Sequence, residues 1–316
     1  MSTWPQRRAR KRPSALLVGA LLVVASCQRA DVPLPGLTAS TVGDTTGLVA
    51  RGEYVVRTVA VCGGCHAADP RNPDGPLSGG TEFRDWRIGT ARAANLTSDV
   101  ETGIGAWSEA EIVRALRNGE HRSGRLLAPV MPYEWFNGMS DRDAMAVARY
   151  LKSLPAVRHD VKESPNFAFK TATALFLGPK EGTSRIAPTR ASAIEYGRYL
   201  SQSVALCGDC HTPRYGLQQK PDYSRLFAGT NKPPKGFPEH PANITPDSAT
   251  GIGRWSEADF VRTIRTGVNP AGDTLHPFMP WHQLRRMTDE DLHAVYRYLR
   301  TVPPIRNEVT RRSRRG

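Results

Sequence analysis

The sequence predicts an all-α protein made of two tandem copies of one helical unit. Three observations support this: most of the 316-residue chain repeats itself once, helix-starting and helix-ending residues recur in the same order in both copies, and neither copy shows the alternation of a long strand. Each copy has few apolar residues to form a hydrophobic core by itself. The 25 prolines and 28 glycines of the chain keep much of it in loops. We therefore expect a few helices wrapped around something other than side chains.

The repeat is visible as aligned blocks. The first block pairs RGEYVVRTVAVCGGCH (51–66) with YGRYLSQSVALCGDCH (196–211), at an offset of 145 residues. The second pairs NLTSDVETGIGAWSEAEIVRALRNG (95–119) with NITPDSATGIGRWSEADFVRTIRTG (243–267), at an offset of 148 that continues to the end of each copy. The second copy is therefore longer than the first by three residues between its C-x-x-C-H motif and its second block.

The repeat boundaries and the composition between them divide the chain into segments. The predicted order is a signal peptide at 1–26, a flexible tether at 27–47, a first domain at 48–156, a linker at 157–190, a second domain at 191–305 and a basic tail at 306–316. The chain carries a net charge of +13, but its basic residues cluster at the two ends rather than on one motif. We therefore expect no binding to nucleic acid.

The amino end is typical of an export signal. Five basic residues and no acidic ones stand in the first 26 positions, and SALLVGALLVVAS (14–26) forms an apolar run too short to span a bilayer, which needs roughly twenty residues. Small residues directly before Cys27 look like the lipobox of bacterial lipoproteins. We expect an exported bacterial protein on the periplasmic side, anchored to the membrane by lipidated Cys27. Ordinary cleavage nearby and an uncleaved anchor are the alternatives.

Each copy is expected to hold three helices. The first, at 48–61 and 193–206, shows helical spacing of apolar residues and leads directly to a cysteine. The second and third begin at capping residues, and they end at a glycine and before a proline. These markers are Ser108, Gly119, Ser140 and Pro155 in the first copy, and Ser256, Gly267, Thr288 and Pro303 in the second.

Apart from Cys27, the cysteines form two C-x-x-C-H motifs, the attachment signature of c-type haem. Two intervening residues put both sulfurs on one side of a helical turn, within reach of the two vinyl groups of a porphyrin. The following histidine then lies under the ring and can ligate the iron. The sequence predicts two covalently attached haem c groups, bound through Cys62, Cys65, Cys207 and Cys210, with His66 and His211 as axial ligands.

Zinc binding, thiol redox chemistry and a structural disulfide are the other uses of paired cysteines. A zinc site needs further cysteines or histidines at paired spacing, and a thioredoxin-like redox site needs a βαβ context. An exported chain permits disulfides, but a bridge across C-x-x-C is strained and leaves the histidine unexplained. Covalent haem accounts for all the residues of both motifs.

The opposite axial ligands are expected to be Met131 and Met279, which align between the copies and are each followed by proline in a loop between helices. Met139 and Met287 also align, but they stand directly before helix N-caps, where a hydrophobic staple belongs. His276 is a further rival, although its counterpart in the first copy is an alanine.

Several further residues are shared by the two copies. Glycines in the first helix are expected to let it cross the last helix closely, with nearby tyrosines meeting across the crossing. Aligned tryptophans at the start of the second helix are expected to pack over the haem, and two aligned Asn-x-Thr sequences are expected to form structural turns rather than glycosylation sites. These residues are Gly52, Gly197, Tyr54, Tyr199, Tyr150, Tyr298, Trp107, Trp255, Asn95 and Asn243.

With these residues in place, both copies resemble class I cytochrome c domains: an amino-terminal helix, C-x-x-C-H, a long loop, a Met-Pro loop and a carboxy-terminal helix. The blocks 95–119 and 243–267 resemble the cytochrome c subunits of bacterial membrane-bound alcohol, aldehyde and gluconate dehydrogenases. The resemblance extends over nearly the whole exported chain, including NFAFKTATALFLGPKEG (166–182). It implies two class I domains that take electrons from a partner dehydrogenase. Members with three haems carry a third C-x-x-C-H unit, which this sequence lacks.

Histidine and methionine together fill both axial positions of an iron and raise its potential relative to two histidines. We therefore expect a di-haem cytochrome that transfers single electrons as the redox subunit or partner of a periplasmic dehydrogenase, with no enzymatic activity of its own. Its acceptor would be another cytochrome, an oxidase or a quinone in a respiratory chain. The alternatives are a di-haem enzyme, peroxidase-like or thiosulfate-oxidising, with one catalytic haem, and a haem-based sensor.

Overall fold

The computed structural model describes residues 46–162, 185–216, 219–233 and 239–310, with four isolated positions between 164 and 169. The predicted signal peptide, Cys27, nearly all of the tether, the middle of the linker and the last six residues of the basic tail lie outside the described residues. The described residues all belong to one compact unit. Among them, no helix is both long enough and apolar enough to cross a membrane.

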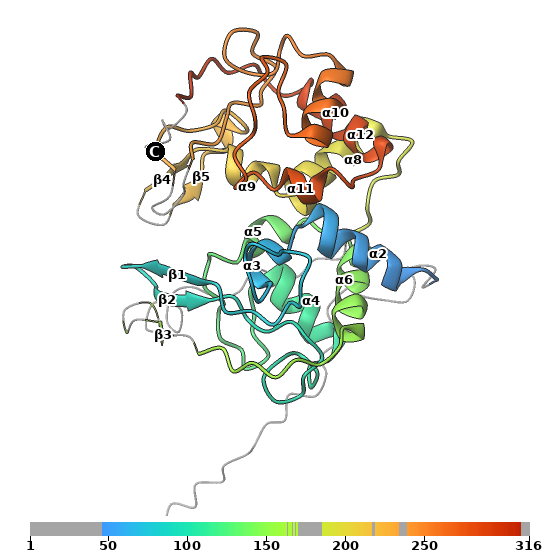
Figure 1. Cartoon of the computed structure of the whole chain (residues 1–316), viewed down its shortest axis with the longest axis vertical. Coiled ribbons are helices and arrows are strands. Elements are labelled where there is room, and N and C mark those ends of the chain that lie inside the picture. The colour runs from blue at the N-terminus through green and yellow to red at the C-terminus, as the bar shows by residue number, and fades with distance from the viewer. Residues whose placement is uncertain are drawn as a thin grey trace, which may run out of the picture. The chain divides into compact units, whose positions relative to one another are not determined.

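The described chain is helical with a few short strands, as the sequence predicts, and one order of helices occurs twice (Figure 1). We call residues 46–162 the first repeat and residues 185–310 the second repeat. The helices of the first repeat are α2 (Leu48–Tyr54), the π-helical segment η1 (Val55–Val59), α3 (Gly63–His66), α4 (Glu109–Asn118), α5 (Tyr133–Phe136) and α6 (Asp141–Ser153). Those of the second are α8 (Ala193–Tyr199), the π-helical segment η2 (Leu200–Val204), α9 (Cys207–His211), the 3₁₀ turn η3 (Tyr223–Arg225), α10 (Glu257–Thr266), α11 (Trp281–Leu284) and α12 (Asp289–Leu299).

The strands are short, and all but the third lie in the loops that follow the cysteine motifs. An antiparallel sheet has the order β1 (Glu82–Asp85), β2 (Gly89–Arg92) and β3 (Ser164–Pro165), with Phe83 paired to Ala91. In the second repeat a two-stranded ladder joins β4 (Arg214–Tyr215) to β5 (Lys220–Pro221). These strands were not predicted, because runs of two to four residues carry no readable alternation.

The predicted helix boundaries are confirmed by their caps. The side chain of Ser108 accepts the N–H of Glu111 and the Glu111 carboxylate accepts the N–H of Ser108, which makes a capping box at the start of α4. Ser256 and Asp259 form the same box at α10. Both helices end at a glycine in the left-handed region, with φ of 71°.

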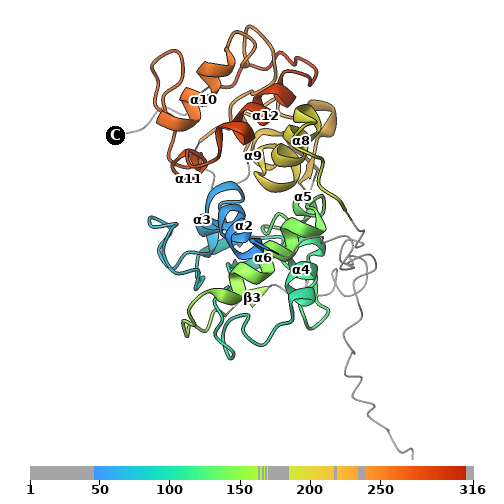
Figure 2. The same ribbon diagram turned by 90° about the vertical axis from the view of Figure 1, so that its right-hand side faces the viewer.

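The first and last helices of each repeat pack against one another, α2 on α6 and α8 on α12 (Figure 2). A Cβ placed on Gly52 would lie 2.0 Å from the carbonyl oxygen of Ala146, and one on Gly197 would lie 1.9 Å from that of Ala294. No other residue fits at either crossing. The predicted role of the two glycines is therefore confirmed. The hydroxyls of the tyrosines two positions later, Tyr54 and Tyr199, instead bond to the other repeat.

The two Asn-x-Thr sequences form buried turns. Asn95 is 3% exposed, its Oδ1 accepts both the N–H and the hydroxyl of Thr97, and its Nδ2 donates to the carbonyl of Val157 at 2.8 Å. Asn243 makes the equivalent bonds to Thr245 and to the carbonyl of Ile305. Both amides are thus committed to the fold, in agreement with a structural role for the turns.

These turns also hold the chain that follows each last helix. Residues 157–162 were assigned to the linker by composition. They pack against the rest of the first repeat, where the His159 N–H donates to Thr102 Oγ1. In the second repeat the N–H of Asn307 likewise donates to Thr250, and Thr310 bonds to Asn231. The ordered part of each repeat therefore extends several residues beyond its last helix.

Candidate functional site

The backbone in front of each cysteine motif has the same unusual course in both repeats. The first helix changes from α to π geometry over η1 and η2, and the next turn places Val61 and Leu206 at φ values of 46° and 56°. Left-handed backbone is strained for a residue with a β-branched or bulky side chain, and such strain persists where the surrounding structure enforces it. The strain therefore marks the approach to Cys62 and Cys207 as a constrained site.

The cysteines of each motif lie on one helical turn, α3 or α9, with Cys62 as the N-cap of α3, and none of these four is in a disulfide. Burial, as the largest cause, raises the pKa of the Cys62 and Cys207 thiols to about 12. Such thiols are protonated at neutral pH, whereas zinc binding and disulfide exchange use thiolates. Among the described residues, no three His, Cys, Asp or Glu side chains gather as a metal site. These cysteines are thus unpaired thiols on one helical turn, which is compatible with thioether formation.

The histidine of each motif is held by one ring nitrogen. His66 Nδ1 lies 2.8 Å from the carbonyl oxygen of Ala94, and His211 Nδ1 lies 2.7 Å from that of Ala242. A carbonyl can only accept, so Nδ1 carries the proton and Nε2 keeps its lone pair. Burial lowers the pKa of both imidazoles, more than the carbonyl contact raises it, which keeps the rings neutral. A neutral imidazole with an oriented Nε2 is the form that binds iron.

The two predicted distal methionines stand in matching turns. The N–H of Met131 donates to the carbonyl of Ala128 at 3.0 Å, and the N–H of Met279 donates to the carbonyl of His276 at 2.9 Å. Both side chains are half-buried and pack against the same hydrophobic cluster as Cys62 and Cys207. The geometry is thus compatible with a thioether facing each motif.

The rival ligands occupy other roles. Met139 and Met287 are 0% and 3% exposed and belong to the hydrophobic core, as expected for residues just before an N-cap. His276 Nδ1 accepts the N–H of Phe278 at 3.0 Å and so shapes the methionine loop of the second repeat. The structure therefore gives each of these rivals a structural role.

Aromatic side chains pack against the core of each repeat. Trp107 and Trp255 are half-buried and pack against the core cluster, and Trp107 meets the ring of His121 edge-on at 4.9 Å. Trp281, two positions after Met279, buries its Nε1 without a hydrogen-bond partner among the described residues. A buried indole N–H needs an acceptor. A carboxylate of a bound haem would supply one, so this orphaned donor also fits the group that the motifs imply.

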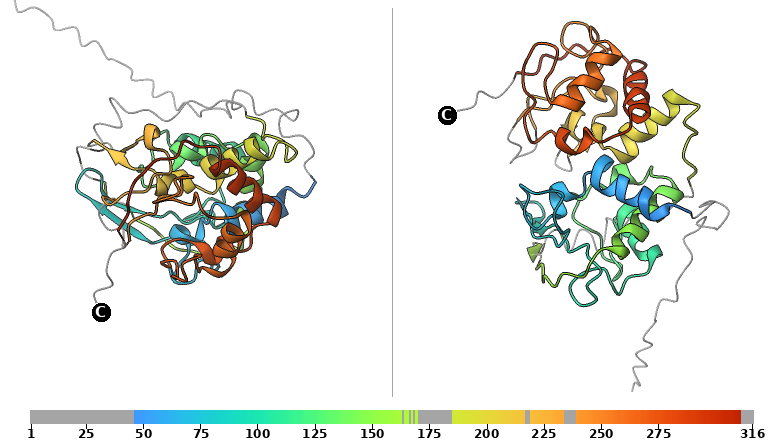
Figure 3. Two further views of the ribbon diagram at one scale, coloured as in Figure 1. Left: turned by 90° about the horizontal axis from the view of Figure 1, so that it is seen from above. Right: turned by 45° about the vertical axis from the view of Figure 1, so that its right-hand side comes forward.

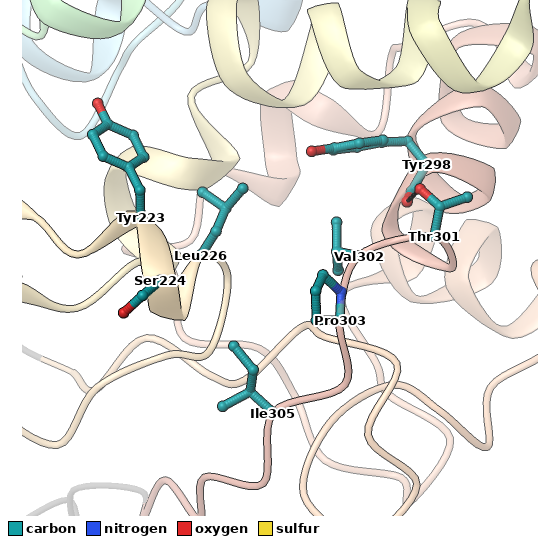
Figure 4. A pocket seen from close by; sticks show the side chains of 8 residues that line it. All are labelled: Tyr223, Ser224, Leu226, Tyr298, Thr301, Val302, Pro303 and Ile305. Atoms are coloured by element: carbon teal, nitrogen blue, oxygen red, sulfur yellow. Dashed lines mark hydrogen bonds between the residues drawn. The ribbon is translucent and has the colours of Figure 1, made fainter.

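A pocket of about 260 Å³ in the second repeat lies apart from these residues (Figure 4). It opens between η3 and the end of α12, and its lining is largely apolar, with Leu226, Val302, Pro303 and Ile305. None of the cysteine, histidine or methionine candidates lines it. Its lining offers no group suited to acid–base or nucleophilic chemistry except tyrosine, serine and threonine hydroxyls, and we assign it no catalytic role.

Sequence reasoning missed two features of the site. The carbonyls of Ala94 and Ala242 carry no side-chain signature, although the offset of 148 that relates them was visible. The short helices α5 and α11, which follow the methionine loops directly, were expected to be loop. Four residues are too few to show helical periodicity.

No protein-family model matches the chain. Among curated proteins it is 32% identical over 270 residues to "Diheme cytochrome c-type" of Cereibacter sphaeroides, which covers 82% of this chain and 88% of that protein. The chain belongs to the family of c-type cytochromes. It therefore carries covalently bound haem c.

Other relatives are subunits of dehydrogenases. This c-type cytochrome is 30% identical over 269 residues to "Gluconate 2-dehydrogenase cytochrome c subunit" of Pantoea cypripedii and 31% identical over 281 residues to "Alcohol dehydrogenase (quinone), cytochrome c subunit" of Gluconacetobacter polyoxogenes. These alignments include 81% and 82% of the chain but 59% and 57% of the relatives. The chain thus spans less than two thirds of the length of these subunits. The expected likeness to dehydrogenase cytochromes is confirmed, and an electron-transfer role is supported.

Proposed function

We propose that this cytochrome carries two haems, one per repeat, and transfers electrons one at a time between a dehydrogenase and a respiratory acceptor on the periplasmic side of a bacterial membrane. The observation that carries the proposal is the exact recurrence of one site: a C-x-x-C-H turn, a histidine Nδ1 on a backbone carbonyl, and a methionine in a tight turn. Both copies therefore have the means to hold a six-coordinate iron.

The residues of each repeat have distinct roles in this proposal. Cys62 and Cys65 would bond the porphyrin, and His66 and Met131 would ligate its iron from opposite sides. Bound haem supplies a single reversible one-electron couple. The carbonyl of Ala94 fixes the plane and tautomer of His66, and the apolar side chains around the site exclude water and favour the less charged oxidation state. Cys207, Cys210, His211, Ala242 and Met279 repeat the arrangement.

The partner is inferred from the relatives. Their printed names assign them to gluconate, alcohol and fructose dehydrogenases. A chain similar to such subunits over four fifths of its length is expected to take electrons from a dehydrogenase of this kind and to pass them to another cytochrome, an oxidase or a quinone. The export signal and lipidated Cys27 that the sequence predicts would hold it at the membrane beside that enzyme.

Carbon monoxide distinguishes an electron carrier from the alternative di-haem enzyme. A carrier with methionine on both irons should show no rapid spectral change when the reduced, exported protein is mixed with carbon monoxide. Rapid binding at one iron would contradict the carrier and favour a peroxidase-like or thiosulfate-oxidising enzyme, which needs an open or displaceable axial position.

Native membranes test the partner. Adding gluconate, ethanol or fructose to membranes that contain the cytochrome should reduce its haems within the turnover time of one dehydrogenase. Membranes from a strain that lacks the chain should lose that reduction and keep the dehydrogenase activity towards an artificial dye. Unchanged substrate-driven respiration in that strain would contradict the assignment to a dehydrogenase chain.

A further inference from the structure

A tyrosine of the first repeat reaches into the second. Tyr54, at the end of α2, donates its hydroxyl to Asp291 Oδ2 at 2.7 Å and accepts the backbone N–H of Thr288 at 3.0 Å. Thr288 and Asp291 form the N-terminal turn of α12. The Tyr54 hydroxyl was expected near Tyr150, on the last helix of the first repeat, but it bonds to the second repeat. The Tyr150 hydroxyl accepts from Arg57 Nε.

The same contact exists in the opposite direction. The hydroxyl of Tyr199 donates to Asp143 Oδ2 at 2.7 Å and accepts the backbone N–H of Ser140 at 3.2 Å, at the start of α6. The tyrosines are related by the offset of 145, and the helix residues are related by the offset of 148. Each repeat therefore caps the last helix of the other with an equivalent tyrosine, as equivalent surfaces do in a two-fold symmetric dimer.

The carboxylates at this interface are buried and paired. Asp143 and Asp291 are 4% and 0% exposed. Arg51 holds both oxygens of Asp143 at 2.8 Å, and Arg190 Nη2 lies 3.5 Å from Asp291 Oδ1. Hydrogen bonds to charged groups stabilise a fold more than neutral ones, and a buried charge that loses a donor is costly. Each tyrosine hydroxyl is thus a strong link between the repeats.

The interface also touches both haem-attachment motifs. Helix α5 packs on η2 and α11 packs on η1, and these π-helical segments lead directly into Cys207 and Cys62. A Cβ on Gly208, between the cysteines of the second motif, would lie 2.5 Å from the indole of Trp135 on α5.

Resting on the proposed function, we infer that Tyr54 and Tyr199 are positioning residues that hold the two attachment motifs at one separation, so that an electron passes from one haem to the other within a single chain. The rate of electron transfer falls steeply with the distance between two centres. Repeats that part even briefly would interrupt the exchange, whereas two reciprocal links at the motifs keep it continuous.

Replacing each tyrosine by phenylalanine removes the hydroxyl and keeps the ring. From the usual strength of a hydrogen bond to a charged group, each replacement should raise the ratio of separated to docked repeats by about ten- to a hundredfold. The Tyr54→Phe/Tyr199→Phe double variant should therefore spend far more time with its haems apart. Tyr296→Phe is the matched control, because the Tyr296 hydroxyl donates to the carbonyl of Trp255 within its own repeat.

The experiment uses the full-length, haem-loaded chain. A flash reduces a minority of the haems, and absorbance follows the redistribution of electrons between the two sites at several protein concentrations. The parent and Tyr296→Phe should redistribute at one rate that does not depend on concentration. The double variant, with two haems by pyridine haemochrome, should redistribute at least several-fold more slowly, and each single variant should fall between.

A covalent link separates positioning from general weakening. A Cβ on Gly138 would lie 3.0 Å from Cβ of Ser203 across the interface, so a Gly138→Cys/Ser203→Cys pair can form a disulfide after a small shift. Added to the double variant, this disulfide should restore the parent rate. A double variant with two haems and the parent rate would overturn the inference, as would a slow rate that the disulfide leaves slow. A parent protein with fewer than two haems would instead refute the proposed function.

Discussion

At the scale of single residues, the ability of the site to bind iron depends on which ring nitrogen of each histidine is available as a ligand. The carbonyls of Ala94 and Ala242 occupy the Nδ1 protons of His66 and His211 and leave Nε2 available. The methionine turns keep Met131 and Met279 half-buried beside the same apolar cluster. These local contacts, rather than the number of histidines and methionines in the chain, distinguish the four proposed ligands from the other candidates.

Met131→His should lower the potential of one haem by on the order of 100 mV, because axial ligands set haem potentials over a range of roughly 0.8 V and histidine lowers the potential relative to methionine. A potentiometric titration followed by visible spectroscopy measures the change. Met139→Leu is the control, since Met139 is buried in the core and should leave both potentials unchanged. Unaltered potentials in Met131→His would remove Met131 from the ligands.

The residues that could be predicted from the sequence are those whose identity carries the chemistry. Cys62, Cys65 and His66 are recognisable because attachment of haem needs those side chains at that spacing. The carbonyl of Ala94 could not be predicted, since every residue offers a backbone carbonyl and only the tertiary structure brings this one to His66. The left-handed Val61 could not be predicted either, because local preference disfavours it and only the tertiary structure enforces it.

At the scale of elements, each repeat is organised by the crossing of its first and last helices, α2 with α6 and α8 with α12 (Figure 3). The caps of α4, α6, α10 and α12 were predictable because a cap is a contact between residues three positions apart. The π-helical segments η1 and η2 were not, since the same apolar residues are compatible with a continuous α-helix.

Gly52→Ala should lower the free energy of unfolding by about 2–3 kcal/mol, because the new methyl group would lie 2.0 Å from the Ala146 carbonyl and push α2 off α6. Urea denaturation of the haem-loaded protein measures the loss. Gly64→Ala is the matched control: a Cβ there meets nothing within 4 Å, and the equivalent position holds Asp209. Its effect should stay within about 0.5 kcal/mol. Equal stability of the two variants would contradict a tight crossing.

At the scale of the whole molecule, the two repeats share one hydrophobic cluster and exchange equivalent hydrogen bonds. The sequence shows the duplication but not this exchange, because Tyr54 and Asp291 are 237 positions apart and nothing local marks them as a pair. Tyr54 was expected to meet Tyr150 across the helix crossing of its own repeat. The structure instead bonds the Tyr54 hydroxyl to Asp291 and the Tyr199 hydroxyl to Asp143, each in the other repeat.

Asp143→Asn should destabilise the protein by about 3 kcal/mol at pH 7, because it removes one partner of a buried ion pair. Burial raises the pKa of Asp143, but the hydrogen bonds and charge of Arg51 outweigh burial and hold this pKa below its ordinary value. A lowered pKa in the folded state gives stability that is present in full above the unfolded value of about 3.9 and is lost as the pH falls through the folded value.

The difference in unfolding free energy between the parent and Asp143→Asn should therefore be constant near neutral pH and shrink below about pH 4. Denaturation of both proteins at a series of pH values measures it, and the comparison cancels the other acidic groups that the two proteins share. A difference that grows on acidification would contradict the charged pairing of Asp143 with Arg51.

The proposed electron transfer depends on two porphyrins held by thioether bonds. Peptide mass spectrometry of the mature, exported protein tests this directly. The predicted result is one haem on the peptide with Cys62 and Cys65 and one on the peptide with Cys207 and Cys210. An unmodified cysteine pair in either peptide would contradict the account.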